Sequence, residues 1–207
     1  MTPRVKICGV TRAEDAELAT ALGAAAIGFV FWPESPRCVV PSRARAIVAA
    51  LPPFVAAVGV FVNATADEVA KIAGDARLSA IQLHGGELVR DFSHLPWPII
   101  KAVAVRRGRR PPELRDVPSD VPVLLDAFDT TTFGGTGRPI DWQVAAAIAA
   151  ERPVILSGGL GAENVADAIA TVAPLAVDVS SGVESSPGVK DAGRLRAFFA
   201  AVEGARS

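Results

Sequence analysis

Short apolar segments alternate with alanine-rich helical stretches along almost all of this 207-residue chain. Segments rich in Val, Ile and Phe have the length and composition of buried strands, and they span residues 5–8, 26–30, 55–61, 80–83, 99–103, 121–126, 154–157 and 176–180. Helix starts separate most of them, and Thr11 with Glu14 and Thr65 with Glu68 have the spacing of capping boxes. This alternation predicts an α/β fold of parallel strands joined by right-handed helical crossovers.

Eight such units either close into a barrel or spread into a doubly wound sheet, and two features favour the barrel. No G-x-G-x-x-G motif follows the first strand, where a dinucleotide-binding sheet carries it. Successive strands begin at fairly even intervals of about 20 to 30 residues, without a linker between them. We therefore expect a (β/α)8 TIM barrel, with residues 1–207 forming a single compact domain of eight parallel strands. Its weakest helix should lie between the fifth and sixth strands, where Pro111, Pro112 and Pro118 leave little room.

Charge and composition exclude several classes of protein. The net charge is −1, and the dense basic cluster at residues 106–110 contains no aromatic residue, so we expect a solvated loop and no nucleic-acid partner. The chain contains no run of 18 residues free of polar or charged side chains, and we expect no membrane span. Two cysteines, Cys8 and Cys38, are too few for a zinc site. The first residues enter a strand without a signal-peptide pattern, so we expect a cytoplasmic protein with free thiols and no metal.

Two glycine-rich turns indicate a phosphate-binding site. Residues 157–160 and 178–184 each follow a predicted strand and precede a helical pattern. Glycines let the backbone approach a ligand closely, and the N-terminus of a helix attracts anions. The expected contacts are Gly158, Gly159, Ser180, Ser181 and Gly182. Glycine turns without a ligand are the alternative, but the last two units of a parallel barrel commonly hold phosphate.

The two widest gaps between strands follow the second and the sixth strand. They contain residues 31–37 and 128–137, and both are loops on the C-terminal face, where barrel active sites are built. The second loop is glycine-rich enough to close over a substrate. Plain surface loops are the alternative for each.

Several polar side chains occupy strand positions that alternation points into the barrel, although barrel interiors are mostly apolar. They are Lys6, Cys8, Gln82, His84, Lys101, Asp126 and Asp178. A buried charge without a partner costs several kcal/mol, on the order of the stability of many domains. One explanation is mutual compensation, in which the two lysines neutralise the two aspartates. The other is chemistry at the barrel mouth.

Cys8 and Asp126 fit the second explanation, because each ends its strand and therefore lies at the mouth. His84 also ends its strand, and either touches the substrate or only lines the wall. A potential base and an acid facing a phosphate site suggest proton transfer on a sugar phosphate. Arg37 adds a planar fork suited to a carboxylate, unless it is a solvated loop residue.

The chain resembles the phosphoribosylanthranilate isomerases of tryptophan biosynthesis, and the resemblance covers essentially the whole sequence. Each motif is weak alone, but the ordered set is highly specific. The motifs are 5–9 with Thr11, 28–31 leading to 35–37, 58–62, 82–85, 125–126 with 134–137 and 141–142, 156–160 with 164–165, and 177–184 running to 188–191.

The resemblance implies an Amadori rearrangement of N-(5′-phosphoribosyl)anthranilate to 1-(2-carboxyphenylamino)-1-deoxyribulose 5-phosphate, without a cofactor or a metal. By the same resemblance, Cys8 corresponds to the general base, Asp126 to the general acid and Arg37 to the anthranilate contact. The glycines and serines of the last two units correspond to the phosphate site, and we expect His84 among the substrate-binding residues.

Two rival interpretations remain at this stage. The related isomerases of histidine biosynthesis are longer chains with aspartates in both catalytic roles, whereas the first strand of this chain ends in Cys8. A non-catalytic sensor of phosphorylated ligands needs the phosphate site but not both Cys8 and Asp126. The expected partner is the phosphorylated sugar–anthranilate substrate, and the chain is expected to be a monomer or a homodimer.

Overall fold

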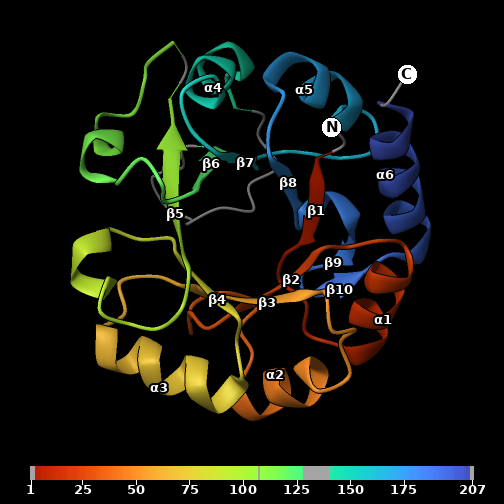
Figure 1. Ribbon diagram of the computed structural model, residues 1–207. Coiled ribbons are helices and arrows are strands. Elements are labelled where there is room, and N and C mark those ends of the chain that lie inside the picture. The colour runs from red at the N-terminus through yellow and green to blue at the C-terminus, as the bar shows by residue number, and fades with distance from the viewer. Residues whose placement is uncertain (1–2, 107, 128–139, 206–207) are drawn as a thin grey trace.

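A closed barrel of eight parallel strands forms the centre of the structure, with β8 pairing back to β1. The computed structural model describes residues 3–106, 108–127 and 140–205. Helices and helical turns surround the strands as an outer ring (Figure 1). The TIM-barrel fold expected from the alternating pattern is confirmed, since consecutive strands are neighbours all the way around.

The elements follow one another in the order that the sequence pattern predicts. The barrel strands are β1 (Arg4–Ile7), β2 (Ala26–Val30), β3 (Ala56–Phe61), β4 (Ala80–Leu83), β5 (Ile99–Val105), β6 (Val123–Ala127), β7 (Val154–Leu156) and β8 (Ala176–Val179). The α-helices of the described chain are α1 (Ala13–Ala21), α2 (Pro41–Val48), α3 (Ala66–Ala76), α4 (Trp142–Ala149), α5 (Val165–Val172) and α6 (Ala192–Gly204). Each barrel strand lies where it was expected, with ends that differ by at most two residues.

Short 3₁₀ helices replace α-helices after two of the strands. They are η1 (Val89–Phe92), between β4 and β5, and η2 (Pro112–Asp116), between β5 and β6. The weak helix expected between the fifth and sixth strands is thus confirmed as a short turn. Prolines explain it, because a ring without an N–H group cannot donate within a longer helix.

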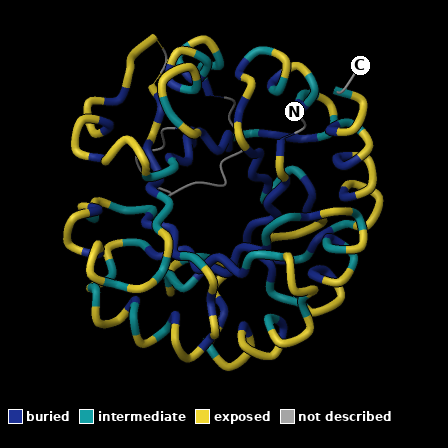
Figure 2. Tube along the Cα trace, in the orientation of Figure 1, coloured by how far each residue is buried: buried dark blue, intermediate teal, exposed yellow. Residues whose placement is uncertain are grey.

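Side chains alternate between two cores, one inside the barrel and one between strands and helices. The inner cluster consists of Ala102, Leu124, Ile155 and Ala176, with Ile100 packed against it. Their neighbours in sequence, such as Leu125 and Val177, belong to the larger outer core. Figure 2 shows buried backbone along the inner ring and exposed backbone on the outer helices. The strand register therefore decides which residues reach the barrel interior.

The two predicted capping boxes have different outcomes. At α3 the prediction is confirmed, because the Thr65 side chain accepts from the Glu68 backbone and the Glu68 carboxylate accepts from the Thr65 backbone. At α1 it is wrong, because the helix begins at Ala13 with Arg12 as its N-cap. Thr11 instead donates its hydroxyl to the Gly188 carbonyl oxygen, 2.6 Å away. The Thr11 side chain thus makes a long-range hydrogen bond instead of the local capping contact that the motif predicts.

A small antiparallel hairpin that the sequence pattern did not predict follows β8. A 3₁₀ turn, η3 (Ser181–Val183), leads into β9 (Glu184–Ser186), which pairs with β10 (Val189–Lys190). Figure 1 shows this hairpin beside β1 and α1. It brings the end of the last unit next to the first strand.

The glycine-rich loop 128–137, expected to close over a substrate, lies outside the described residues. None of the helices in the described part of the chain has both the length and the apolarity that crossing a bilayer requires.

Candidate active site

The carboxyl ends of the strands converge at one end of the barrel, which we call the barrel mouth. Cys8 directly follows β1, His84 follows β4, and Asp126 lies near the end of β6. Ser157 and Ser180 follow β7 and β8. Parallel strands in a closed barrel present these ends on one face, so barrel closure brings the residues of these five strand-loop units together.

The base side of the mouth is organised around a buried ion pair below Cys8. Lys6 Nζ donates to Asp178 Oδ1 at 2.7 Å, and both side chains are almost fully buried. Of the two explanations left open for the buried charges, compensation thus describes Lys6 and Asp178, whereas Asp126 has no lysine partner among the described residues. Gly28 on β2 makes room for this group, because a Cβ there would lie 3.0 Å from Cys8 Sγ and 3.2 Å from Lys6 Nζ. A glycine on this strand thus brings the amine and the thiol together.

Burial and the ion pair act in opposite directions on the two titrating groups. Burial alone lowers the pKa of Lys6, but the Asp178 charge and the neighbouring Cys8 outweigh it, so the net pKa is raised. Burial raises the pKa of Cys8, Lys6 and Lys190 lower it, and Asp178 raises it further, with a net increase. Lys6 thus favours the thiolate form of Cys8. Desolvation nevertheless dominates at Cys8.

The acid side of the mouth contains Asp126, His84 and Gln82. Asp126 Oδ1 accepts the Ala127 backbone N–H at 2.8 Å, and Asp126 Oδ2 lies 3.4 Å from His84 Nε2. The other ring nitrogen, His84 Nδ1, lies 2.8 Å from the amide nitrogen of Gln82. Sequence reasoning placed Gln82 and His84 on one face, and the structure adds that they form a chain of contacts leading to Asp126.

Lys101 does not point into the barrel, so that prediction is wrong. The register pairs Lys101 with Leu83 and Val123, which both face the helices. Its amine donates to the Gly85 carbonyl oxygen at 2.7 Å and lies 3.6 Å from the Glu87 carboxylate. Alternation fixes the period of a strand but not which set of residues faces inward. In β5 the inward set is Ile100 and Ala102.

Arg37 lies at the mouth, held by the hairpin. Its Nε and Nη2 donate to the Glu184 carboxylate at 2.9 Å and 2.7 Å. Lys190 Nζ donates to the same carboxylate at 2.8 Å and to the Cys8 carbonyl oxygen at 2.5 Å. Burial raises the pKa of Glu184, but Arg37 and Lys190 outweigh it and the net pKa is lowered. Gly9 lies beneath Arg37, since a Cβ there would meet the arginine Cδ.

Sequence reasoning assigned no role to Glu184 and Lys190. Their pairing requires the hairpin to fold back toward β1, and no local pattern revealed that. The indication available was that both residues stand in the motifs of the family resemblance.

The predicted phosphate contacts lie in two adjoining loops after β7 and β8. Gly158 and Gly159 have φ values of 85° and 65°, in the left-handed region that favours glycine. Asn164 braces this loop, donating to the Gly159 carbonyl oxygen at 2.8 Å and accepting from the Gly161 N–H at 2.9 Å. The Ser180 hydroxyl is buried and has no hydrogen-bond partner among the described residues.

One part of the phosphate prediction is wrong. We expected α-helices to begin directly at both glycine turns, but α5 begins only at Val165, and β8 is followed by the short turn Ser181–Val183. A free hydroxyl and left-handed glycines therefore replace the expected helix N-termini. Gly182 packs against the Leu160 carbonyl oxygen, where a Cβ has no room, so the two loops are in contact.

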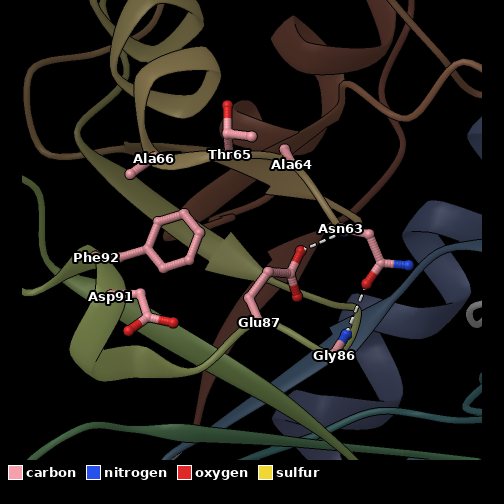
Figure 3. A pocket seen from close by; sticks show the side chains of 8 residues that line it. All are labelled: Asn63, Ala64, Thr65, Ala66, Gly86, Glu87, Asp91 and Phe92. Carbon is pink, nitrogen blue, oxygen red and sulfur yellow. Dashed lines mark hydrogen bonds between the residues drawn. The ribbon is translucent and has the colours of Figure 1, made fainter.

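A separate hollow of about 320 Å³ lies between the loops that follow β3 and β4. Figure 3 shows Asn63 and Glu87 on its wall, joined by a hydrogen bond from the Asn63 N–H to the carboxylate, with a second bond from the Gly86 N–H to Asn63. Asp91 and Phe92 complete the opposite side. The carboxylates of Glu87 and Asp91 make this hollow unsuitable for an anionic sugar phosphate. Within the described ranges, no cluster of three or more His, Cys, Asp or Glu side chains is placed to hold a metal ion.

Comparison with known proteins places the chain in one enzyme family. The family model described as N-(5′-phosphoribosyl)anthranilate (PRA) isomerase matches residues 5–201. The N-(5′-phosphoribosyl)anthranilate isomerase of Pseudomonas fluorescens is 49% identical over 200 residues, which cover 96% of this chain and 98% of that protein. The crystal structure of phosphoribosyl anthranilate isomerase from Thermus thermophilus has a TM-score of 0.88 at 44% identity, covering 97% and 98% of the two chains.

The crystal structure of another phosphoribosyl anthranilate isomerase contains reduced 1-(o-carboxyphenylamino)-1-deoxyribulose 5-phosphate. It has a TM-score of 0.83 at 41% identity and covers 98% of this chain and 99% of that one.

Proposed function

Since this chain belongs to the N-(5′-phosphoribosyl)anthranilate isomerase family and catalyses the isomerase step of tryptophan biosynthesis, we propose that Cys8 is its general base and Asp126 its general acid. The observation that best supports this proposal is that the two groups lie at the ends of β1 and β6, in the same barrel mouth. The reaction needs an acid and a base in different environments. Asp126 lies beside an imidazole, whereas Cys8 lies beside the Lys6–Asp178 pair.

In the first step, Asp126 donates a proton to the ring oxygen of the ribose. The C1′–O bond breaks, and the anilino nitrogen lone pair forms an iminium with C1′. The ring oxygen becomes a hydroxyl, and Asp126 becomes a carboxylate. A positioned acid of this kind typically contributes a factor of about 10² to 10⁴ in rate.

In the second step, the Cys8 thiolate removes the C2′ proton and the electron pair neutralises the iminium, giving an enolamine. Tautomerisation then moves a proton from the C2′ hydroxyl to C1′ and gives the ketone. At the end of the turnover Cys8 is a thiol and Asp126 is a carboxylate. Proton exchange with solvent then restores the thiolate and the carboxylic acid. No external oxidant or reductant enters this balance.

Three groups bind the substrate in this proposal. Arg37 contacts the anthranilate carboxylate, and its fork is fixed in orientation by Glu184. The phosphate occupies the loops of Gly158, Gly159, Ser180, Ser181 and Gly182, where the buried Ser180 hydroxyl offers a donor. His84 lines the mouth beside Asp126. The complex of a relative with a reduced 1-(o-carboxyphenylamino)-1-deoxyribulose 5-phosphate supports a ligand with both anionic groups.

We also propose a cytoplasmic location and a single catalytic domain over residues 1–207. A reducing compartment keeps thiols such as Cys8 and Cys38 free, which supports the location. The expectation of a monomer or homodimer stays a prediction.

The decisive experiment compares Cys8→Ser with Cys38→Ser by the turnover of N-(5′-phosphoribosyl)anthranilate. Serine is almost isosteric with cysteine but far too weak an acid to supply its anion, so Cys8→Ser should bind substrate nearly normally and turn over slower by a factor of about 10² to 10⁴. Cys38 is exposed, and Cys38→Ser should match the parent enzyme.

Circular dichroism of both serine variants serves as the control for folding, and the histidine-pathway substrate is assayed beside N-(5′-phosphoribosyl)anthranilate. Full activity in Cys8→Ser excludes the proposed base.

A further inference from the structure

Gln82 is a buried amide in a part of the barrel that offers it little hydrogen bonding. The side chain is fully buried, and its register partners on β3 and β5 are Val60 and Ile100. Its carbonyl oxygen, Oε1, has no hydrogen-bond partner among the described residues. Burying an amide with an unpaired acceptor costs free energy, so an apolar residue at this position gives a more stable barrel. The amide nitrogen makes one directed contact, to His84.

That contact determines which nitrogen of the His84 ring holds the proton. Gln82 Nε2 lies 2.8 Å from His84 Nδ1, and an amide nitrogen donates but does not accept. Nδ1 must therefore be the acceptor, which leaves the proton of the neutral ring on Nε2. The present orientation leaves one amide N–H and the carbonyl oxygen unpaired, whereas the opposite one would leave both amide N–H groups unpaired, and unpaired buried N–H groups are the rarer defect.

The protonated nitrogen faces the carboxyl group of Asp126. His84 Nε2 and Asp126 Oδ2 are 3.4 Å apart, which is longer than an ordinary hydrogen bond. Catalytic hydrogen bonds are often long without substrate and shorten in the transition state. The Asp126 carboxyl gains a negative charge when it gives its proton to the substrate, and a hydrogen bond to a charged acceptor is shorter and stronger. The contact thus favours the state after proton donation.

We propose that Gln82 is a positioning residue that holds His84 with its Nε2–H directed at Asp126, so that the imidazole stabilises the carboxylate formed in the first step. The inference rests on the proposed role of Asp126 as the acid. Because the interaction strengthens only as charge develops, it raises turnover rather than substrate affinity. Gln82 touches neither substrate nor reacting atoms and acts through His84.

The parent enzyme alone gives the first test. The chain contains two histidines, and the second, His94, is exposed on the segment between η1 and β5. A long-range ¹⁵N–¹H correlation spectrum at about pH 8, where an ordinary imidazole is neutral, reports the tautomer of each ring. His94→Gln assigns the signals. We expect His84 to be the Nε2–H tautomer, and an Nδ1–H tautomer overturns the inference.

The second test moves the ring proton. Gln82→Glu keeps the size of the side chain but presents oxygens, so the proton should shift to Nδ1 and Nε2 should lose its hydrogen. Hydrogen bonds to charged groups contribute about 1.5 to 3 kcal/mol, so kcat should fall about 10- to 100-fold while KM changes little. Ile100→Val perturbs the register partner of Gln82 on β5 without removing a hydrogen-bonding group, and it should keep both the parent tautomer and the parent kcat.

Should Gln82→Glu fail to fold, Gln82→Met removes the donor with an apolar side chain of similar length. It should give a mixture of tautomers and a smaller loss of kcat. A parent-like kcat in a folded variant whose tautomer has changed overturns the inference.

A double variant separates this inference from the proposed acid. In an Asp126→Asn background, Gln82→Glu should cause no further loss. An active Asp126→Asn enzyme defeats the proposed role of Asp126, whereas a further loss of kcat in the double variant defeats only the role of Gln82.

Discussion

The two sides of the barrel mouth are built from different kinds of interaction. On the side of β1, β8 and the hairpin, charged groups pair with one another: Lys6 with Asp178, and Arg37 and Lys190 with Glu184. On the side of β4 and β6, a carboxyl group, an imidazole and an amide lie in sequence. Among the described residues, neither lysine nor arginine lies within ion-pair distance of Asp126.

The difference fits the charges that the roles proposed for Cys8 and Asp126 require. On the base side, three cationic side chains face two carboxylates, which leaves one positive charge to favour a thiolate at Cys8. Burial works against that charge, and the net pKa of Cys8 is raised. On the acid side, the side chains next to Asp126 are an imidazole and, beyond it, an amide. Among the described residues, cations therefore gather on the side of the proposed base, Cys8, and an imidazole and an amide lie on the side of the proposed acid, Asp126.

The largest expected effect is the loss of the acid itself. Asp126→Asn keeps the shape of the side chain and removes its proton, so kcat should fall about 10²- to 10⁴-fold. Stability should change less than activity, because the amide oxygen still accepts from the Ala127 N–H. Steady-state turnover, with urea unfolding as the control for folding, measures both. Near-normal turnover of the Asp126→Asn enzyme contradicts the proposed role of Asp126 as the acid.

The next effect should come from unbalancing the charged side. Lys6→Met leaves Asp178 buried without its cation, and removing one member of a buried ion pair costs about 3 to 5 kcal/mol of unfolding free energy. Lys71→Met breaks the exposed ion pair with Asp75 and should leave that free energy nearly unchanged. Urea titration of both variants measures the difference.

A Lys6→Met enzyme as stable as the parent contradicts this view of the ion pair. If Lys6→Met with Asp178→Leu regains most of the loss, the cost lies in the unpaired charge rather than in lost packing.

The smallest effect is a shift in pH dependence. Because burial raises the pKa of Cys8, the thiolate is the minor form at neutral pH, and its fraction grows about tenfold per pH unit below that pKa. The base acts as the thiolate, so kcat/KM should rise with pH through the neutral range. In a folded Lys6→Met enzyme the rise should move to higher pH, because Lys6 lowers the pKa of Cys8.

The profile of Cys38→Ser serves as the control and should overlie that of the parent. A kcat/KM that stays flat between about pH 7 and about pH 9 argues against a thiol base at Cys8.

Local sequence patterns were sufficient to predict where the strands lie, but not which residues of every strand face the barrel interior. Residues such as Lys6 and Cys8 were placed correctly, because Val5 and Ile7 leave one choice for the outward face of β1. The prediction for Lys101 was wrong, because we expected a polar residue of β5 to face the barrel interior. Its side chain is instead buried on the helix side, where the amine contacts the Glu87 carboxylate and two backbone carbonyl groups. A lysine can be buried on either face of a strand if hydrogen-bond or ion-pair partners lie on that face. For Lys101 those partners come from the end of β4 and the loop that follows it.

The sequence by itself determined the period of the strands, the α/β class, the barrel rather than the open sheet, and the strand ends at which Cys8 and Asp126 stand. Those properties depend on neighbours within a few residues, which hydrophobic period and turn chemistry record. Only the tertiary structure decided that Glu184 orients Arg37, that Thr11 binds Gly188 instead of capping α1, and that Gln82 reaches Asp126 through His84. Most of these contacts join residues far apart in the chain, and even the neighbouring Gln82 and His84 meet Asp126 only because the barrel closes. Their geometry therefore follows from barrel closure and the return of the hairpin to β1, which no local pattern encodes.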